Sequence, residues 1–130
     1  MTDPIADMLI RIKNSQEVKQ DTVDIPHSKM KESMTKIFVE EGYVKKFEVL
    51  KRMGKKHLRL TLKYNQKRAG VIRGLKRVST PGRRIYSEAK SLSSIQAGFG
   101  TVIISTSKGL LTDDAARLQK LGGEVLCYIW

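Results

Sequence analysis

Three consecutive hydroxyl side chains, Ser105, Thr106 and Ser107, follow four residues of strand character and stand directly before Lys108 and Gly109. Each hydroxyl can both donate and accept a hydrogen bond, and Gly109 lets the chain turn where a side chain would clash. Such a tip suits hydrogen bonding to phosphate, ribose or the edge of a base. The alternative is an ordinary turn rich in Ser and Thr. The charge of the remaining chain favours the first interpretation.

The chain is strongly basic, with a net charge of +12 over 130 residues. Residues 66–112 contain nine Lys and Arg but one acid, whereas residues 1–65 contain fourteen basic and nine acidic residues. This excess predicts a polyanionic partner that meets the second half of the chain. Binding to a membrane surface is disfavoured, because it would normally use a basic amphipathic helix and the cations here fall on expected strands and turns. A membrane span is not expected either, because no apolar run approaches the roughly 20 residues that cross a bilayer.

Cysteine usage and the N-terminus indicate a cytoplasmic protein. Cys127 is the single cysteine, so no internal disulfide can form. It alternates with Val125 and Ile129, which predicts a packed core thiol. The first residues lack the basic and apolar regions of a secretory signal.

Hydrophobic periodicity predicts an N-terminal lobe of α-β-α-β-β order. We expect a helix over 3–14 and a strand over 22–25, then a helix capped by Ser28 that continues to about Glu41. A hairpin over 43–50 and 57–64 follows, with alternating apolar residues in its second strand. The second helix is expected to bury Met30, Met34, Ile37 and Phe38.

The C-terminal lobe is expected to be mostly antiparallel β with a short helix. Residues 65–70 are polar and basic and predict the joint, giving an α+β protein with lobes 1–64 and 65–130. Strands are expected over 71–79, over 83–86 after the Thr80-Pro81-Gly82 turn, from Thr101, and over 124–130. Leu92, Ile95 and Ala97 suggest one helical turn, and Thr112 can cap a short helix.

An enzyme is disfavoured. His27 and His57 lack partners at metal-ligand spacing, so no metal and no cofactor are expected. Asp113 and Asp114 fit the first turn of a helix better than a catalytic pair. A hydrolase that uses Ser105 as its nucleophile stays a third alternative, although no sequence pattern supplies a base.

Nucleic-acid binding has positive support from basic residues, from the hydroxyl tip and from Tyr86. An aromatic ring at a strand end can stack on a base, although a core tyrosine is an equal alternative. Glu124 either accepts a specific hydrogen bond beside a phosphate binder or caps the backbone. Lys29 and Lys31 stand in the first turn of a helix, where cations oppose the dipole, and either meet an external anion or lie on an ordinary surface. Helix-turn-helix, zinc-finger and RNP signatures are absent from the sequence.

Several motifs together resemble the bacterial small-subunit ribosomal protein number eight family, and the resemblance spans essentially the whole chain. They are residues 2–9 (Thr-Asp-Pro-Ile-Ala-Asp-Met-Leu), 77–82 (Arg-Val-Ser-Thr-Pro-Gly), 84–86 (Arg-Ile-Tyr), 100–113, 115–117 (Ala-Ala-Arg) and 122–124 (Gly-Gly-Glu). Arg83 departs from the aliphatic residue usual there, so a phosphate contact is expected to replace a core contact. Trp130 stands where small residues are commoner, which leaves the packing of the last strand open.

The resemblance implies a structural, non-catalytic protein of the small ribosomal subunit that binds the central domain of its ribosomal RNA early in assembly. It implies that Ser105, Thr106 and Ser107 bond the sugar–phosphate backbone and an unpaired base, which Tyr86 and Glu124 border. It also implies proteins five and twelve as neighbours and, in some members, repression of the protein's own messenger. The full set of expected RNA-binding residues is Ser105, Thr106, Ser107, Lys108, Gly109, Tyr86, Gly122, Gly123, Glu124, Arg77, Arg83, Arg84, Lys29 and Lys31.

The sequence leaves a general basic nucleic-acid-binding protein as the runner-up function. Preference for one structured RNA over duplex DNA at fixed salt would separate the two. The expected location is the ribosome in the cytoplasm, with an organellar ribosome left open.

Overall fold

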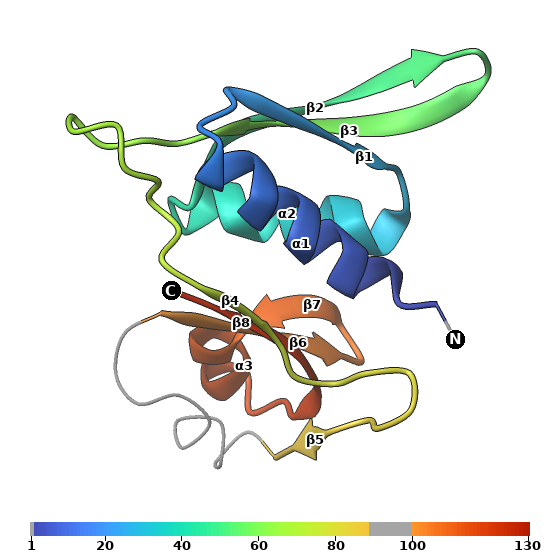
Figure 1. Ribbon diagram of the computed structural model, residues 1–130. Helices are drawn as coiled ribbons and strands as arrows, with labels where there is room; N and C mark the ends of the chain where they lie inside the picture. Colours follow the sequence, from blue (N-terminus) through green and yellow to red (C-terminus); the bar gives the residue numbers. More distant parts are fainter. Residues whose placement is uncertain (1, 89–99) are drawn as a thin grey trace. The chain divides into compact units, whose positions relative to one another are not determined.

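The structure, a computed structural model, describes residues 2–88 and 100–130. The chain divides into two compact units (Figure 1). The first unit is Ile5–Arg73, and the second is Met1–Pro4 together with Gly74–Trp130. Each unit combines helix with antiparallel sheet, which confirms the predicted α+β class. The predicted division into an α/β lobe over 1–64 and a β-rich RNA-binding lobe over 65–130 stays a prediction.

The first unit is a three-stranded antiparallel sheet with two helices. Its elements are α1 (Pro4–Glu17), β1 (Thr22–Pro26), α2 (Lys29–Glu40), β2 (Val44–Arg52) and β3 (Lys55–Leu62). The strand order is β1-β3-β2, with β3 in the centre. The predicted alternation in β3 is confirmed because Leu58, Leu60 and Leu62 are buried, whereas the residues between them are partly exposed. One face of this sheet therefore contributes to the core, together with apolar residues of α1 and α2.

Helix α2 begins where the sequence predicts, but its buried face is shifted by one residue. The hydroxyl of Ser28 accepts a hydrogen bond from the Lys31 amide at 3.1 Å, which confirms the N-cap. Met30 was predicted to be buried, and this is wrong because 42% of it is exposed. Lys31 is buried instead, and its ammonium donates to the carbonyl of Pro26 at 3.1 Å. A lysine stem can fill an apolar space when its charged end finds a polar partner.

The second unit is built on a five-stranded antiparallel sheet. Its elements are β4 (Leu75–Arg77), β5 (Tyr86–Ser87), β6 (Thr101–Thr106), β7 (Gly109–Thr112), α3 (Asp113–Leu118) and β8 (Gly123–Ile129). The order is β4-β8-β6-β7, and β5 pairs with the beginning of β8. The hydroxyl of Thr112 accepts a hydrogen bond from the Ala115 amide at 3.2 Å, so the predicted cap of α3 is confirmed.

Two predictions for the start of the second unit are wrong. The expected strand over 71–79 is reduced to Leu75–Arg77, because the amides of Val71 and Ile72 bond to Lys63 and Gln16 of the first unit's fold. The segment 83–86 does not form a hairpin with β4, because after the single bridge Thr80–Arg83 the chain pairs with β8. The predicted helical turn around Leu92, Ile95 and Ala97 lies outside the described residues.

Trp130 pairs with Gly74, the residue that directly precedes β4. Its amide and carbonyl both bond to Gly74 at 3.1 Å, and its ring stacks on Tyr128 with centroids 4.7 Å apart. A Cβ atom at Gly74 would lie 2.2 Å from the Trp130 ring. The large terminal side chain is therefore accommodated by a residue that has none.

Cys127 is completely buried, as predicted, and burial raises the pKa of its thiol to about 12. Since the thiolate is the reactive form, we expect native protein at pH 8 to react with an aromatic disulfide reagent at least about 100-fold more slowly than unfolded protein. Absorbance of the released thiolate measures both rates. Equal rates before and after addition of guanidinium chloride would contradict a sealed core thiol.

Candidate nucleic-acid interface

The hydroxyl tip is the turn that joins β6 to β7. Thr106 lies opposite Gly109 in the register, and Gly109 has a φ of +99°. The hydroxyl of Thr106 donates to the Gly109 carbonyl at 2.8 Å and accepts from the Lys108 amide at 3.1 Å. The middle hydroxyl therefore shapes the turn, and Gly109 supplies a backbone conformation that other residues rarely adopt.

The two flanking hydroxyls are differently placed. Ser107 is exposed, as is Lys108, whereas Ser105 is half-buried at the end of β6. Within the part of the chain that the structure describes, neither serine hydroxyl has a hydrogen-bond partner. The tip thus presents the hydroxyls of Ser105 and Ser107 without a hydrogen-bond partner among the described residues, while the Thr106 hydroxyl shapes the turn between them.

Three of the expected RNA-binding residues lie in one row across adjacent strands. In the register, Tyr86 of β5 is opposite Glu124 of β8, and Glu124 is opposite Ser105 of β6. A bulge sets this alignment, because Ile103 faces Cys127 whereas Ile104 faces Val125. Tyr86 is 70% exposed, which excludes the alternative of a core tyrosine. An aromatic ring, a carboxylate and a hydroxyl therefore lie side by side at one end of the sheet.

The carboxylate in this row has a cation as its partner. Arg84 donates from Nη1 to Oε2 of Glu124 at 3.0 Å, and this hydrogen bond raises the pKa of Arg84. The Glu124 side chain is 16% exposed, whereas that of Arg84 is 51% exposed. The pair fixes the position of the carboxylate and reduces the repulsion that it would exert on a nearby phosphate.

Gly123 allows β8 to approach β6 closely, while Gly122 before it is exposed. A Cβ atom at residue 123 would lie 2.0 Å from the carbonyl oxygen of Ser105, which is backbone and cannot move aside cheaply. The position therefore requires glycine because of this contact, although its φ is ordinary.

The remaining predicted cations fall into two groups. Arg83 and Lys29 are exposed and can meet a ligand. Arg77 is directed into the second unit, where it forms an ion pair with Asp3 at 3.2 Å and donates to the Leu126 carbonyl at 2.7 Å. Lys31 is buried in the first unit, as described above. Lys29 and Lys31 belong to the first unit and the other predicted site residues to the second.

Ser79 is a positioning residue that the sequence analysis missed. Its buried hydroxyl accepts from the Ile85 amide at 2.8 Å and donates to the Ile85 carbonyl at 3.1 Å. These two hydrogen bonds anchor the segment that contains Arg84 and Tyr86. A lone serine before a Thr-Pro-Gly turn carries no signal of such a role, because the partner is fixed by the folded path of the chain.

The described residues hold no cluster of three or more His, Cys, Asp or Glu side chains able to bind a metal ion. In the same residues, no helix has the length and apolar character needed to cross a bilayer.

Fold and surface define a small, basic α+β protein of two compact units. The family model for ribosomal protein S8 matches residues 3–130. The small ribosomal subunit protein uS8 of Lachnoclostridium phytofermentans is 51% identical, covering 100% of this chain and 98% of that relative. The uS8 protein of Moorella thermoacetica is 48% identical, and the match covers 100% of both chains. The chain belongs to the ribosomal protein S8 family.

Membership confirms the resemblance that the motifs suggested. Proteins of this family are structural and non-enzymatic, which confirms the prediction that the chain is not an enzyme. Ribosomal, translation-related and RNA-binding roles fit the family as well.

Replacing Gly123 with Ala should destabilise the second unit, because the added methyl group must displace the Ser105 backbone. We expect a loss of roughly 1–3 kcal/mol in the free energy of unfolding, measured by urea titration. Gly82→Ala is the matched control, since nothing lies within 4 Å of its added Cβ. Equal stability of the two variants would show that β8 does not need the close approach.

Proposed function

We propose that this chain is a structural constituent of the small ribosomal subunit that binds the central domain of the small-subunit ribosomal RNA directly and helps to assemble it. The single observation that carries the proposal is the row formed by Tyr86, Glu124 and Ser105 beside the exposed Ser107. Family membership supports the ribosomal setting.

The geometry suits recognition of a distorted RNA surface. The wide minor groove of A-form RNA exposes 2′-hydroxyls, and small serine hydroxyls can approach them closely. The exposed ring of Tyr86 offers a face on which an unpaired base can stack, while the neighbouring Glu124 can accept a hydrogen bond from a base amino group. Arg84 holds that carboxylate in place at 3.0 Å.

Cations of the same unit supply the affinity that does not depend on sequence. Lys108 and Arg83 are exposed, and Arg84 is about half exposed despite its bond to Glu124. Lys and Arg that neutralise phosphates release counterions, so binding should weaken steeply as salt rises. The net charge of +12 is consistent with this mode.

The proposal places the chain in cytoplasmic ribosomes beside other small-subunit proteins, with proteins five and twelve as the neighbours that the motifs imply. The same row and tip would also accept a similar hairpin in the protein's own messenger RNA, which would repress its translation. Both statements rest on the resemblance and stay predictions.

Replacing Ser107 with Ala should weaken binding to a central-domain RNA fragment by about 1 kcal/mol or more, which is roughly fivefold, because an exposed hydroxyl loses its RNA partner. Gel-shift titration at fixed salt measures the change. Ser33→Ala in α2 removes a hydroxyl from the other unit and serves as the control. Unchanged affinity of the Ser107 variant would count against a tip that contacts RNA.

Replacing Tyr86 with Ala should cost about 1–3 kcal/mol of binding to the same fragment, because a stacking surface is lost. Tyr86→Phe keeps the ring and should bind nearly as well as the unmodified protein. Fluorescence of a 2-aminopurine placed at the unpaired base reports the stacking directly. If the Phe variant is as weak as the Ala variant, the hydroxyl and not the ring makes the contact.

A further inference from the structure

The end of the β2–β3 hairpin, residues 51–56, concentrates four cations in the first unit. Its sequence is Lys-Arg-Met-Gly-Lys-Lys, and all six residues are exposed. Met53 at the turn is 97% exposed. Figure 1 shows this part of the hairpin extending past the two helices of the unit. We call residues 51–56 the basic finger.

The register places like charges directly opposite each other in the basic finger. Arg52 faces Lys55, and Lys51 faces Lys56. Like charges opposite each other destabilise a strand pair, and neighbouring pairs point to opposite faces of the ribbon. The finger therefore has two cations on each face. None of the four side chains has an ion pair within residues 2–88 and 100–130.

The core does not require these cations. Along the apolar face of the hairpin, Phe47 faces Leu60 and Val49 faces Leu58, and the next pair on that face is Lys51 with Lys56. Val49 is already 42% exposed, so the hairpin leaves the core at this point. The lysine pair thus stands beyond the packed region, where a neutral polar pair would serve folding better.

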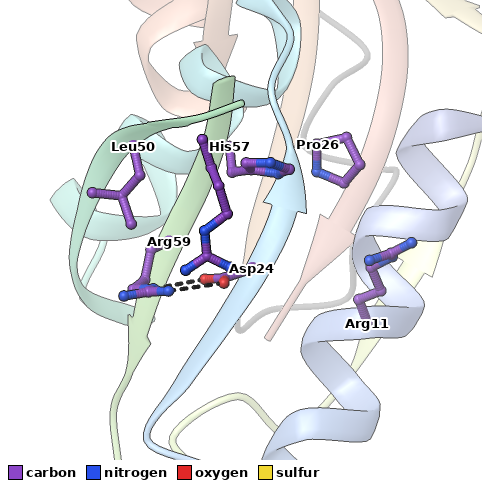
Figure 2. A pocket seen from close by; sticks show the side chains of 7 residues that line it. Arg11, Asp24, Pro26, Leu50, His57 and Arg59 are labelled. Carbon is purple, nitrogen blue, oxygen red and sulfur yellow. Dashed lines mark hydrogen bonds and ion pairs between the residues drawn. The ribbon is translucent and has the colours of Figure 1, made fainter. Parts of the chain in front are cut away.

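The opposite face of the finger continues into a hollow of about 220 Å³ that Arg52 also lines. Figure 2 shows the side chains that line the hollow, which come from α1, β1, β2 and β3. Apart from Arg52, they are Arg11, Asp24, Pro26, Leu50, His57 and Arg59. Asp24 accepts two hydrogen bonds from Arg59, at 2.8 and 3.0 Å, which lower the pKa of the carboxyl. Arg11 is paired with Asp7, whereas Arg52 has no direct ion pair among the described residues and acts on Asp24 only through longer-range electrostatic attraction.

We propose that the basic finger is a second RNA-binding surface, which inserts between two neighbouring stretches of ribose–phosphate backbone and neutralises phosphates on both of its faces. This inference rests on the proposed function and adds a contact separate from the hydroxyl tip. An acidic protein surface would neutralise one face, whereas folded RNA supplies phosphates on two sides of a groove or junction. Binding would also relieve the repulsion between the opposed cations.

The test compares two variants that lose the same charge. In the finger variant, Lys51, Arg52, Lys55 and Lys56 are all changed to Gln. In the control variant, four exposed lysines elsewhere in the first unit, Lys13, Lys45, Lys63 and Lys67, are changed to Gln. Affinity for a central-domain RNA fragment is measured by gel shift across a series of salt concentrations, and Tm is measured on each free protein.

We expect the finger variant to bind at least about tenfold more weakly at 0.1 M salt and its salt slope to fall by about 3, since each phosphate contact contributes about 0.7–0.9. The control variant should change by clearly less. The free finger variant should melt at the same temperature or higher, because opposed like charges are gone. Weaker binding together with undiminished stability separates an RNA contact from a structural role.

Three outcomes would overturn the inference. If the two variants lose affinity and salt slope equally, the finger has no special contact with RNA. If the finger variant keeps full affinity for RNA but no longer binds a purified acidic ribosomal protein, the partner is protein. If unmodified protein binds and Ser107→Ala weakens it while the finger variant does not, the finger fails and the proposed function stands. Absence of binding by the unmodified protein would instead reject the proposed function.

Discussion

The arrangement of the second unit depends on the close antiparallel approach of β8 to β6. Gly123 passes so near the Ser105 carbonyl that a methyl group there would lie 2.0 Å from the oxygen. In the same strand pair, a bulge between Ile103 and Ile104 brings Glu124 opposite Ser105. Because β5 pairs with the same part of β8, Tyr86 joins the row as well. The close β8–β6 approach, the bulge and the pairing of β5 with β8 together align groups from three strands.

Polar side chains in this protein divide between those that build the fold and those left for a partner. Thr106 shapes the tip turn and Ser79 anchors the segment before Tyr86. Arg77 binds Asp3 and a backbone carbonyl, although its position in a basic strand suggested a phosphate contact. Side chains that are hydrogen-bonded within the fold position those that are left for a ligand, and such preorganisation lowers the entropy lost when the ligand binds.

The positive charge is distributed in a way that opposes stability at the finger. Opposed cations at the end of β2 and β3 cost free energy in the isolated protein, and a polyanion would recover it. The second unit shows the opposite arrangement, because Glu124 is paired with Arg84 beside the tip. The partly neutral surface of the second unit suits recognition of RNA shape. The highly charged finger of the first unit suits neutralisation of the phosphate backbone.

The sequence by itself determined the local features: helix caps at Ser28 and Thr112, the buried leucines of β3, the core thiol and the identity of the hydroxyl tip. It did not reveal that Lys31 replaces Met30 in the core, that β5 pairs with β8, or that Tyr86 is exposed. Periodicity and capping depend on residues a few positions apart, so they can be read along the chain. Register, bulges and burial depend on contacts between distant segments, and only the tertiary structure decides them.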